Sequence, residues 1–261
     1  MNSNVRIKRD AFYLANGNEV TLFKQAARHR LPVLLKGPTG CGKTRLIEHM
    51  AAFLNRPLYT VACHDDLTAT DLVGRHLVNQ DGTWWQDGPL TKAVREGGIC
   101  YLDEVVEARR DTTVVIHPLC DDRRLLPIDR TGELVDAHPD FQLVISYNPG
   151  YQSVYKGLKP STRQRFVAIR LDYPAEKNEI QVVMHETGID HDTATTLVTL
   201  ANELRRLKDV HLEEGLSTRM IVYAARLLTT GLSMRETLLS CFCESLTDQD
   251  EDLQALMAWL D

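Results

Sequence analysis

A glycine-rich run near the start of the chain has the residue types that bind a nucleotide phosphate. Every fixed position of the pattern G-x-x-x-x-G-K-[ST] is filled, by Gly37, Pro38, Thr39, Gly40, Cys41, Gly42, Lys43 and Thr44. In such a loop the backbone N–H groups point at the phosphates, Lys43 neutralises the β- and γ-phosphates, and the Thr44 hydroxyl holds Mg²⁺. We expect this run, with the adjoining Arg45, to bind ATP and Mg²⁺. A glycine-rich turn that binds nothing is the alternative, and the complete pattern disfavours it.

Two adjacent carboxylates end a second apolar run. Asp103 and Glu104 follow Gly98–Leu102, and neighbouring positions at a strand end face different ways, so they can serve different tasks. We expect Asp103 to hold Mg²⁺ through its water shell and Glu104 to orient and deprotonate the water that attacks the phosphate. A second carboxylate beside the metal acid favours hydrolysis over transfer to a small acceptor. Acidic residues are also common in loops, so this motif depends on the phosphate-binding run before it.

The apolar pattern around these motifs predicts a parallel α/β sheet flanked by helices. Short runs typical of buried strands recur along the first two thirds of the chain, separated by segments long enough to cross over a sheet. The glycine-rich loop lies between the first run and a helical stretch at 45–54, which is the strand–loop–helix context that phosphate binding needs. The predicted strands are Leu31–Lys36, Leu58–Ala62, Gly98–Leu102, Phe141–Ser146 and Phe166–Leu171.

Beyond Tyr173 and Pro174 the pattern becomes helical. Strand-like runs stop there, and apolar residues recur at the spacing of amphipathic helices. We therefore predict an ATPase core over residues 1–173 and a small all-helical domain over 174–261, with Pro174 interrupting whatever precedes it. The predicted helices are Ala175–His185, Asp192–Leu207, Thr218–Thr229, Met234–Phe242 and Asp248–Leu260.

Composition limits the class of partner. The formal charge of −6 argues against a general nucleic-acid binder, because affinity for phosphate backbones needs clustered Lys and Arg, so a protein partner is favoured. No apolar run is long enough for a membrane span, and the polar Met1–Asp10 is not followed by a signal-peptide core. The six cysteines show no CxxC spacing, which is typical of reduced thiols. We expect a cytoplasmic protein.

Three further positions resemble the AAA+ ATPases, a ring-forming class of P-loop proteins. Asn148 ends the predicted strand at Phe141–Ser146, where that class uses an Asn to position the hydrolytic water, although Asn-Pro also favours a simple turn. Arg163 and Arg165 precede the last predicted strand, where the class supplies an arginine to the neighbouring subunit's ATP; either could be that finger. Arg219 opens a helix and resembles the arginine that contacts γ-phosphate from the helical lid, with helix capping by its neighbours as the alternative.

The resemblance narrows to the CbbQ/NorQ/NirQ subfamily of the MoxR group. That group carries an insert in its second helix and a hairpin before the residue matching Asn148. Here the adjacent Trp84 and Trp85 stand in a polar stretch bracketed by Gly82 and Gly88, which we interpret as a projecting loop with one Trp packed inward. Residues 125–135 predict two short strands around a turn, with Pro127 on an edge. The resemblance is carried by the runs 35–45, 71–75, 84–90, 101–109 and 146–152.

This resemblance implies a homohexameric ATPase that remodels another protein. Members known as CbbQ act with CbbO, which carries a von Willebrand factor A domain, to release inhibitory sugar phosphates from Rubisco; members known as NorQ help nitric oxide reductase to mature and acquire metal. We expect the Rubisco role, with nitric oxide reductase as the alternative. A P-loop small-molecule kinase would be a monomer and is disfavoured by the Asp103–Glu104 pair and by two arginines at the finger position. A nucleotide-gated scaffold with little turnover is a third possibility.

Overall fold

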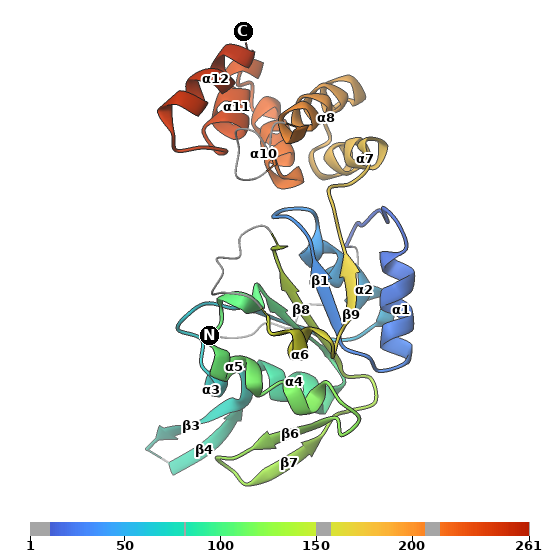
Figure 1. Cartoon of the computed structure of the whole chain (residues 1–261), viewed down its shortest axis with the longest axis vertical. Coiled ribbons are helices and arrows are strands. Elements are labelled where there is room, and N and C mark those ends of the chain that lie inside the picture. The colour runs from blue at the N-terminus through green and yellow to red at the C-terminus, as the bar shows by residue number, and fades with distance from the viewer. Residues whose placement is uncertain (1–10, 81, 150–157, 207–214, 261) are drawn as a thin grey trace. The chain divides into compact units, whose positions relative to one another are not determined.

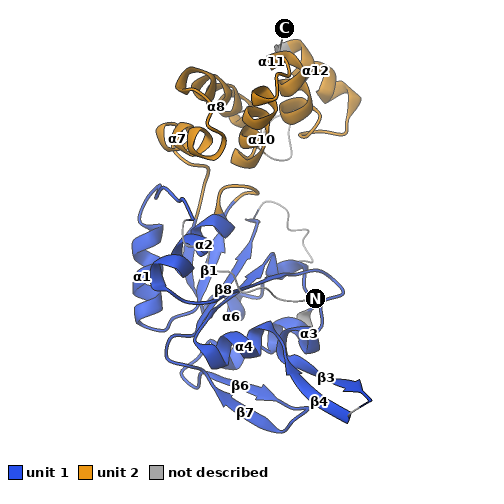
Figure 2. Cartoon of the chain, turned by 180° about the vertical axis from the view of Figure 1, so that it is seen from behind, with its two compact units in different colours: residues 1–37, 43–170 blue, residues 38–42, 171–261 orange. Residues whose placement is uncertain are grey.

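The structure is a computed structural model that describes residues 11–80, 82–149, 158–206 and 215–260 (Figure 1). The chain divides into two compact units. Unit 1 consists of residues 1–37 and 43–170, and unit 2 of residues 38–42 and 171–261 (Figure 2). The expectation for the polar residues Met1–Asp10 lies outside the described residues. No helix in the described ranges has the length and apolar character that crossing a bilayer would demand.

A five-stranded sheet forms the centre of unit 1. Its order is β2-β5-β8-β1-β9, and every neighbouring pair is parallel. All five predicted strands are therefore confirmed as one sheet, and β8 is buried along its whole length because strands flank it on both sides. The bounds are β1 Val33–Lys36, β2 Leu58–Ala62, β5 Ile99–Asp103, β8 Gln142–Tyr147 and β9 Val167–Arg170.

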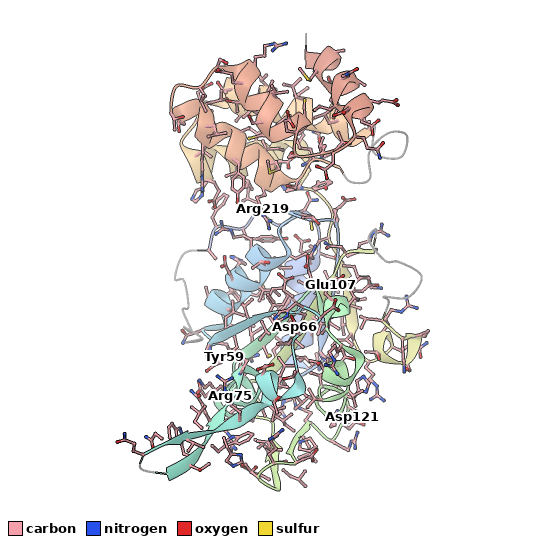
Figure 3. The ribbon with its side chains drawn as sticks, turned by 90° about the vertical axis from the view of Figure 1, so that its left-hand side faces the viewer. Tyr59, Asp66, Arg75, Glu107, Asp121 and Arg219 are labelled. Atoms are coloured by element: carbon pink, nitrogen blue, oxygen red, sulfur yellow. The ribbon has the colours of Figure 1, made fainter. Side chains whose placement is uncertain are left out.

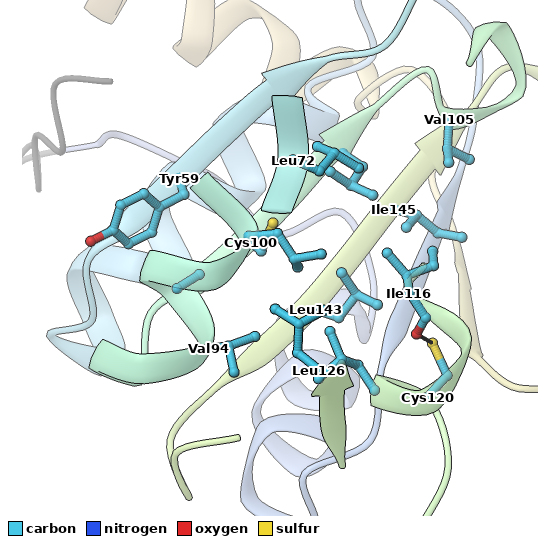
Figure 4. Close-up of a cluster of buried hydrophobic side chains, with 14 of the residues drawn as sticks. Tyr59, Leu72, Val94, Cys100, Val105, Ile116, Cys120, Leu126, Leu143 and Ile145 are labelled. Carbon is cyan, nitrogen blue, oxygen red and sulfur yellow. Dashed lines mark hydrogen bonds between the residues drawn. The ribbon is translucent and has the colours of Figure 1, made fainter. Parts of the chain in front are cut away.

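Apolar side chains cover both faces of this sheet. Leu34, Cys100 and Leu143 alternate with their neighbours onto one face, where they join Leu90 and Val94 of helix α4 in the cluster of Figure 4. The alternate positions are equally buried and face the side where α1 and α2 pack. The helical bounds are α1 Glu19–Arg28, α2 Lys43–Leu54, α3 Ala69–Val73, α4 Pro89–Glu96, α5 Arg110–Val114 and α6 Pro160–Arg163, with short 3₁₀ turns η1 Val105–Glu107 and η2 His117–Leu119.

Helix α4 shows how local sequence sets these elements. It starts with Pro89 at its first position, where a missing N–H costs nothing, and stops at Gly97, whose φ of 74° is left-handed. A side chain at Gly97 would collide with His138, since an added Cβ would lie 2.3 Å from its ring nitrogen. The helix thus ends in time for the chain to enter β5.

Two antiparallel hairpins extend unit 1 near the amino ends of its strands (Figure 1). One pairs β3 Gly74–Asn79 with β4 Gly82–Asp87, and the other pairs β6 Leu125–Ile128 with β7 Glu133–Asp136. The second confirms the two strands predicted within 125–135. The loop interpretation of Trp84 and Trp85 is wrong, because both residues lie in β4 and pair with β3. Strand alternation leaves Trp84 44% exposed and packs Trp85 against the core, as expected for one residue of the pair.

Arg95 of α4 connects the two hairpins. Its guanidinium lies 3.0 Å from Asp87 at the end of β4 and 2.6 Å from Glu133 at the start of β7. All three side chains keep substantial contact with solvent, at 37%, 24% and 43% exposed respectively. This ionic bridge therefore forms at the surface of unit 1.

Unit 2 is helical throughout its described residues after Leu171. Its helices pack around a core that includes Val183, Leu197 and Phe242, all fully buried. The predicted helices are confirmed, except that Met234–Phe242 is not one α-helix: it changes at Leu239 into a single π-helical turn, Leu239–Cys243. The bounds are α7 Glu176–Thr187, α8 His191–Arg206, α10 Thr218–Thr229, α11 Met234–Leu238 and α12 Asp250–Leu260.

Candidate nucleotide site

The predicted site residues of unit 1 gather at the carboxyl edge of the sheet. β1 runs into Gly37, β5 ends at Asp103, and β8 leads to Asn148. Since β8 pairs with both β5 and β1, Asn148 follows the strand between the other two. The carboxyl edge of a parallel sheet is where open α/β proteins bind ligands. Residues 150–152 of the run that follows Asn148 lie outside the described residues.

Lys43 opens helix α2 with its ammonium held inside this edge. The residue is 8% exposed, and Nζ donates to the Gly37 carbonyl at 2.9 Å and to Asn148 Oδ1 at 2.5 Å. Both of these acceptors are neutral, and a Lys at this position of the pattern is the group that neutralises phosphate charge. The contact also brings Lys43 and Asn148 together, although the two residues are far apart in the sequence.

The loop between Gly37 and Lys43 has the backbone that phosphate binding needs. Gly40 and Gly42 have φ angles of 68° and 98°, which place both residues in the region that side chains disfavour. Left-handed and right-handed residues in alternation turn successive N–H groups inward into an anion-binding nest. Arg45, one turn into α2, lies 3.6 Å from Glu48.

Asp103 is held through one carboxylate oxygen. Tyr101 and Ser146 each donate a hydroxyl proton to Asp103 Oδ1 at 2.6 Å, because an ionised carboxylate only accepts. Among the described residues, nothing donates to Oδ2. Burial, followed by the nearby charge of Asp103, raises the pKa of Tyr101, so its hydroxyl keeps its proton.

The same hydroxyl lies near Thr44 as well as Asp103. The Thr44 side chain acts to lower the pKa of Tyr101, against the larger effects of burial and of Asp103. Thr44 is exposed and Asp103 half-buried. Mg²⁺ prefers oxygen ligands and keeps several waters, and these two groups present a hydroxyl and a carboxylate oxygen beside one another. The donor set fits Mg²⁺ bound with a nucleotide phosphate.

Glu104 presents its side chain from an unusual backbone conformation. Its φ and ψ of 55° and 47° are left-handed, which non-glycine residues rarely adopt. Its N–H donates to Ser146 Oγ at 3.2 Å, and its carbonyl accepts from the Glu107 N–H at 2.8 Å. The side chain is exposed, so it can meet a water or substrate at this edge.

Cys63 borders the same carboxylates from the end of β2. Its N–H donates to the Asp103 carbonyl at 2.9 Å, and the residue is 7% exposed. Burial, with the charges of Asp103 and Glu104, raises the pKa of its thiol to about 12. Cys63 therefore stays a neutral thiol and adds no charge to the site.

The two candidate finger arginines have different surroundings. Arg165 lies 3.5 Å from Asp121, which Arg123 also binds at 2.7 Å. The Arg163 side chain is exposed at the end of α6 and makes no hydrogen bond or ion pair with any described residue. The structure thus separates an arginine that is engaged within its own chain from one that is not.

Arg219, the remaining predicted site residue, belongs to unit 2. It is exposed in the first turn of α10 and is labelled in Figure 3. Ser217 caps that helix by accepting from the Met220 N–H, which agrees with the capping alternative for the neighbouring residues. The role of Arg219 stays a prediction.

Sequence reasoning missed Tyr101 and Ser146. Both are fully buried in strands that were interpreted as apolar core. The available signal was a hydroxyl-bearing residue two positions before Asp103 and another two before Asn148, since alternate residues of a strand share a face.

Two known protein families together match most of the chain. The family described as "AAA domain (dynein-related subfamily)" matches residues 32–166, and the family described as "CbbQ/NirQ/NorQ C-terminal" matches residues 179–261. A crystal structure from Cytophaga hutchinsonii, described as that of an ATPase, superposes with a TM-score of 0.54 at 16% identity, covering 96% of this chain and 82% of that one. At that identity the likeness shows the fold alone.

Three curated relatives are similar over most of their length. The denitrification regulatory protein NirQ of Stutzerimonas stutzeri is 60% identical over 94% of this chain and 90% of its own. NorQ of Paracoccus denitrificans is 61% identical over 92% and 89%, and CbbQ of Hydrogenophilus thermoluteolus is 59% identical over 87% and 85%. The three identities are nearly equal, so similarity alone does not separate one name from another.

Proposed function

Because this chain belongs to the CbbQ/NirQ/NorQ family of AAA ATPases, we propose that it hydrolyses ATP to remodel another protein. The observation that supports this most is the joined group at the carboxyl edge: a buried lysine bonded to Asn148, beside Asp103 with one oxygen left for a cation. We propose that the work is done in the cytoplasm by a homohexameric ring.

Each site residue has a distinct task in this proposal. Lys43 and the N–H groups of the run 37–44 bind the phosphates, and Thr44 and Asp103 hold Mg²⁺, largely through water. Glu104 takes the proton of the attacking water, and Asn148, fixed by Lys43, orients that water. Mg²⁺ supplies charge neutralisation on the phosphate oxygens when bound.

Arg163 is the arginine we assign to the neighbouring subunit's ATP. Its side chain is exposed and bonds to none of the residues that the structure describes, whereas Arg165 is paired with Asp121 in its own chain. An arginine supplied in trans raises the rate by about 10³–10⁵, so hydrolysis would depend on ring assembly. Arg219 of the helical unit would contact γ-phosphate in the same subunit, so that the lid responds to nucleotide state.

Two client proteins are consistent with the family. We propose Rubisco first, reached through a partner with a von Willebrand factor A domain like that of CbbO, with release of inhibitory sugar phosphates as the outcome. The second candidate is maturation of nitric oxide reductase, including metal insertion. It is favoured by the relatives named NirQ and NorQ, which are 60% and 61% identical to this chain.

A paired reconstitution tests the proposal. Sugar-phosphate-inhibited Rubisco from the same organism is incubated with this protein, its von Willebrand factor A partner and ATP, with Glu104→Gln as the inactive control. Recovery of carboxylase activity that needs ATP and is lost in the variant supports the Rubisco role. If carboxylase activity is not recovered while ATP hydrolysis is intact, Rubisco is rejected as the client. The same assay with metal-depleted nitric oxide reductase then tests the second candidate client.

Two other classes predict different results in the same assay. A small-molecule kinase would behave as a monomer and would consume ATP only with an acceptor. A nucleotide-gated scaffold would hydrolyse little ATP, and Glu104→Gln would change its assembly without changing a rate that matters. Measuring phosphate release and molecular mass alongside client recovery separates both classes from a remodelling ATPase.

A further inference from the structure

Ser146 lies where the two carboxylates of the proposed site can both be controlled. We propose that Ser146, with Tyr101, is a positioning residue that aims Asp103 at the metal and Glu104 at the attacking water. The inference deepens the proposed function and rests on it. Neither residue would touch nucleotide; each acts through a neighbouring group.

The Ser146 hydroxyl has a fixed direction. The residue is fully buried in β8, and its proton goes to Asp103 Oδ1 at 2.6 Å. Its oxygen is then an acceptor only, and it accepts the Glu104 N–H at 3.2 Å. The Ser146 hydroxyl therefore connects β8 to the side chain of Asp103 and to the backbone of Glu104.

Tyr101 holds the same carboxylate oxygen from its own strand. Its proton also goes to Asp103 Oδ1, at 2.6 Å, and its oxygen lies 3.1 Å from Ser146 Oγ. With two donors on Oδ1, rotation of the carboxylate is blocked and Oδ2 is the oxygen left for the cation.

Glu104 needs a second device because its backbone is strained. A non-glycine residue in the left-handed region persists only where surrounding bonds hold it there. The bonds to Ser146 Oγ and from the Glu107 N–H hold the peptide on both sides. Without Ser146 the peptide can relax towards a right-handed conformation, and the Glu104 carboxylate would turn away from the water.

Two substitutions separate the orientation of Asp103 from the support of the Glu104 backbone. Tyr101→Phe removes one donor to Asp103 and leaves the Glu104 bond, whereas Ser146→Ala removes a donor and the Glu104 bond together. Thr91→Val is the matched control: it deletes another fully buried hydroxyl of unit 1, whose acceptor, the Val73 carbonyl, keeps its bond from the Gly88 N–H. Ser146→Thr restores the hydroxyl.

The readouts are binding and rate in the full-length protein. Affinity for a fluorescent N-methylanthraniloyl ADP is measured with and without Mg²⁺, and the ratio of the two gives the metal's contribution. We expect both variants to reduce that ratio about tenfold, the value of one hydrogen bond to a charged group. At saturating Mg²⁺ only Ser146→Ala should also lower kcat by about tenfold or more, and Ser146→Thr should regain part of it.

The outcomes distinguish this inference from the proposed function. If the wild-type protein shows no Mg²⁺ effect or no hydrolysis, the proposed function fails. If the wild-type protein is active, and Ser146→Ala keeps both the wild-type ratio and the wild-type kcat, the positioning role is overturned. It is also overturned if Thr91→Val matches Ser146→Ala in ratio and rate, because the effect is then a general loss of packing. Thermal unfolding followed by circular dichroism confirms that each compared variant is folded.

Discussion

Among the described residues, a buried polar network in each unit can be compared, and the two differ in how completely they are satisfied. In unit 1 the open network consists of Tyr101, Asp103 and Ser146, and it leaves Asp103 Oδ2 without a donor among the described residues. In unit 2 the closed network consists of Tyr173, Glu179, Arg205 and Thr218. Glu179 is fully buried, and both its oxygens accept: Arg205 binds it at 2.7 and 2.8 Å, and Thr218 binds it at 2.5 Å.

The closed network continues through Arg205, which uses four of its N–H groups as donors. Nε donates to the Leu216 carbonyl at 2.7 Å, a terminal nitrogen also donates to Asn202 at 3.0 Å, and the guanidinium lies 3.9 Å from the Tyr173 ring centre. A buried carboxylate with both oxygens bonded stabilises the fold and has no oxygen left for a ligand. An unsaturated one at an accessible edge keeps capacity for a ligand. We expect substitutions in the closed network to change the stability of the fold. Substitutions around the open network should change the rate of ATP hydrolysis.

The largest predicted effect on the rate of ATP hydrolysis concerns Arg163 and Arg165. Like the two networks, these neighbouring arginines differ in whether their side chains are already bonded within the chain. Arg163→Ala, which removes the unengaged arginine, should lower the rate of ATP hydrolysis by about 10³-fold or more. Arg165→Ala, which removes the partner of Asp121, should lower it by less than about tenfold, since it loses only an exposed ion pair. Phosphate release by the assembled protein measures both.

Mixing subunits checks that Arg163 acts in trans. Subunits with Arg163→Ala keep Glu104, and subunits with Glu104→Gln keep Arg163, so each is inactive alone but a mixed ring contains complete sites. Partial recovery of hydrolysis on mixing is expected. If mixing restores nothing, or if Arg165→Ala proves the more damaging change, our assignment of the finger is wrong.

Glu104→Gln tests the carboxylate whose backbone the open network holds. The change should lower hydrolysis by about 10²–10⁴-fold, because it removes the general base while keeping the shape of the side chain. Binding of fluorescent ADP and the melting temperature should be unchanged, since Glu104 is exposed and its backbone bonds remain. Glu133→Gln, an exposed carboxylate at the opposite end of unit 1, is the control and should keep the wild-type rate. Substantial hydrolysis by Glu104→Gln would remove the basis for this role.

Glu179→Ala tests the closed network. It leaves Arg205, which is 10% exposed, as a buried charge without its partner, and breaking such pairs costs about 3–5 kcal/mol. We expect a loss of about 3 kcal/mol in the free energy of unfolding of unit 2, measured by urea denaturation. The double variant Glu179→Leu with Arg205→Met should recover much of it, because two apolar side chains replace the pair. A single variant as stable as the wild type would show that water already reaches this cluster.

The sequence could predict the candidate site only in part. Lys43, Asp103, Glu104 and Asn148 lie at strand ends next to glycine, acidic or proline-containing motifs, and those positions are recognisable one segment at a time. Tyr101 and Ser146 are different: their hydroxyls meet because β5 pairs with β8, and an apolar run does not state which strand will be its neighbour. The contact between the two hydroxyls therefore depends on tertiary structure, which the local sequence pattern does not predict.

The misinterpreted segments have related causes. Trp84 and Trp85 were placed in a loop because the stretch is polar, yet an exposed two-stranded hairpin is polar on its solvent side and needs only alternation and a turn to form. The π-helical turn at Leu239–Cys243 occurs where three residues, Cys241, Phe242 and Cys243, are all buried, which packing in unit 2 requires and helical periodicity does not predict.

A pH titration examines the segment that carries Arg163. His117 Nε2 lies 3.4 Å from the Thr162 hydroxyl on α6, and burial, then the charges of Arg165 and Lys159, lower its pKa, while Asp121 acts in the opposite direction. A lowered folded-state pKa means that neutral His117 contributes stability above the unfolded value of about 6.5, and that this contribution is lost as pH falls through the folded value. The melting temperature of the wild type should therefore fall more between pH 7 and 5 than that of His117→Gln. Parallel curves for the two proteins would contradict this account.

Arg95 should give the smallest effect, and it sharpens the comparison because its ion pairs are exposed whereas that of Arg205 is buried. Each arginine binds carboxylate from another element, yet Arg95 and its partners Asp87 and Glu133 remain in contact with solvent. Arg95→Ala should cost at most about 1 kcal/mol of unfolding free energy, and the cost should shrink as salt is raised, because exposed pairs are screened. Urea denaturation at low and high salt measures both. A loss as large as that of Glu179→Ala would mean that the connection between the hairpins, rather than burial, sets the value of an arginine bridge in this protein.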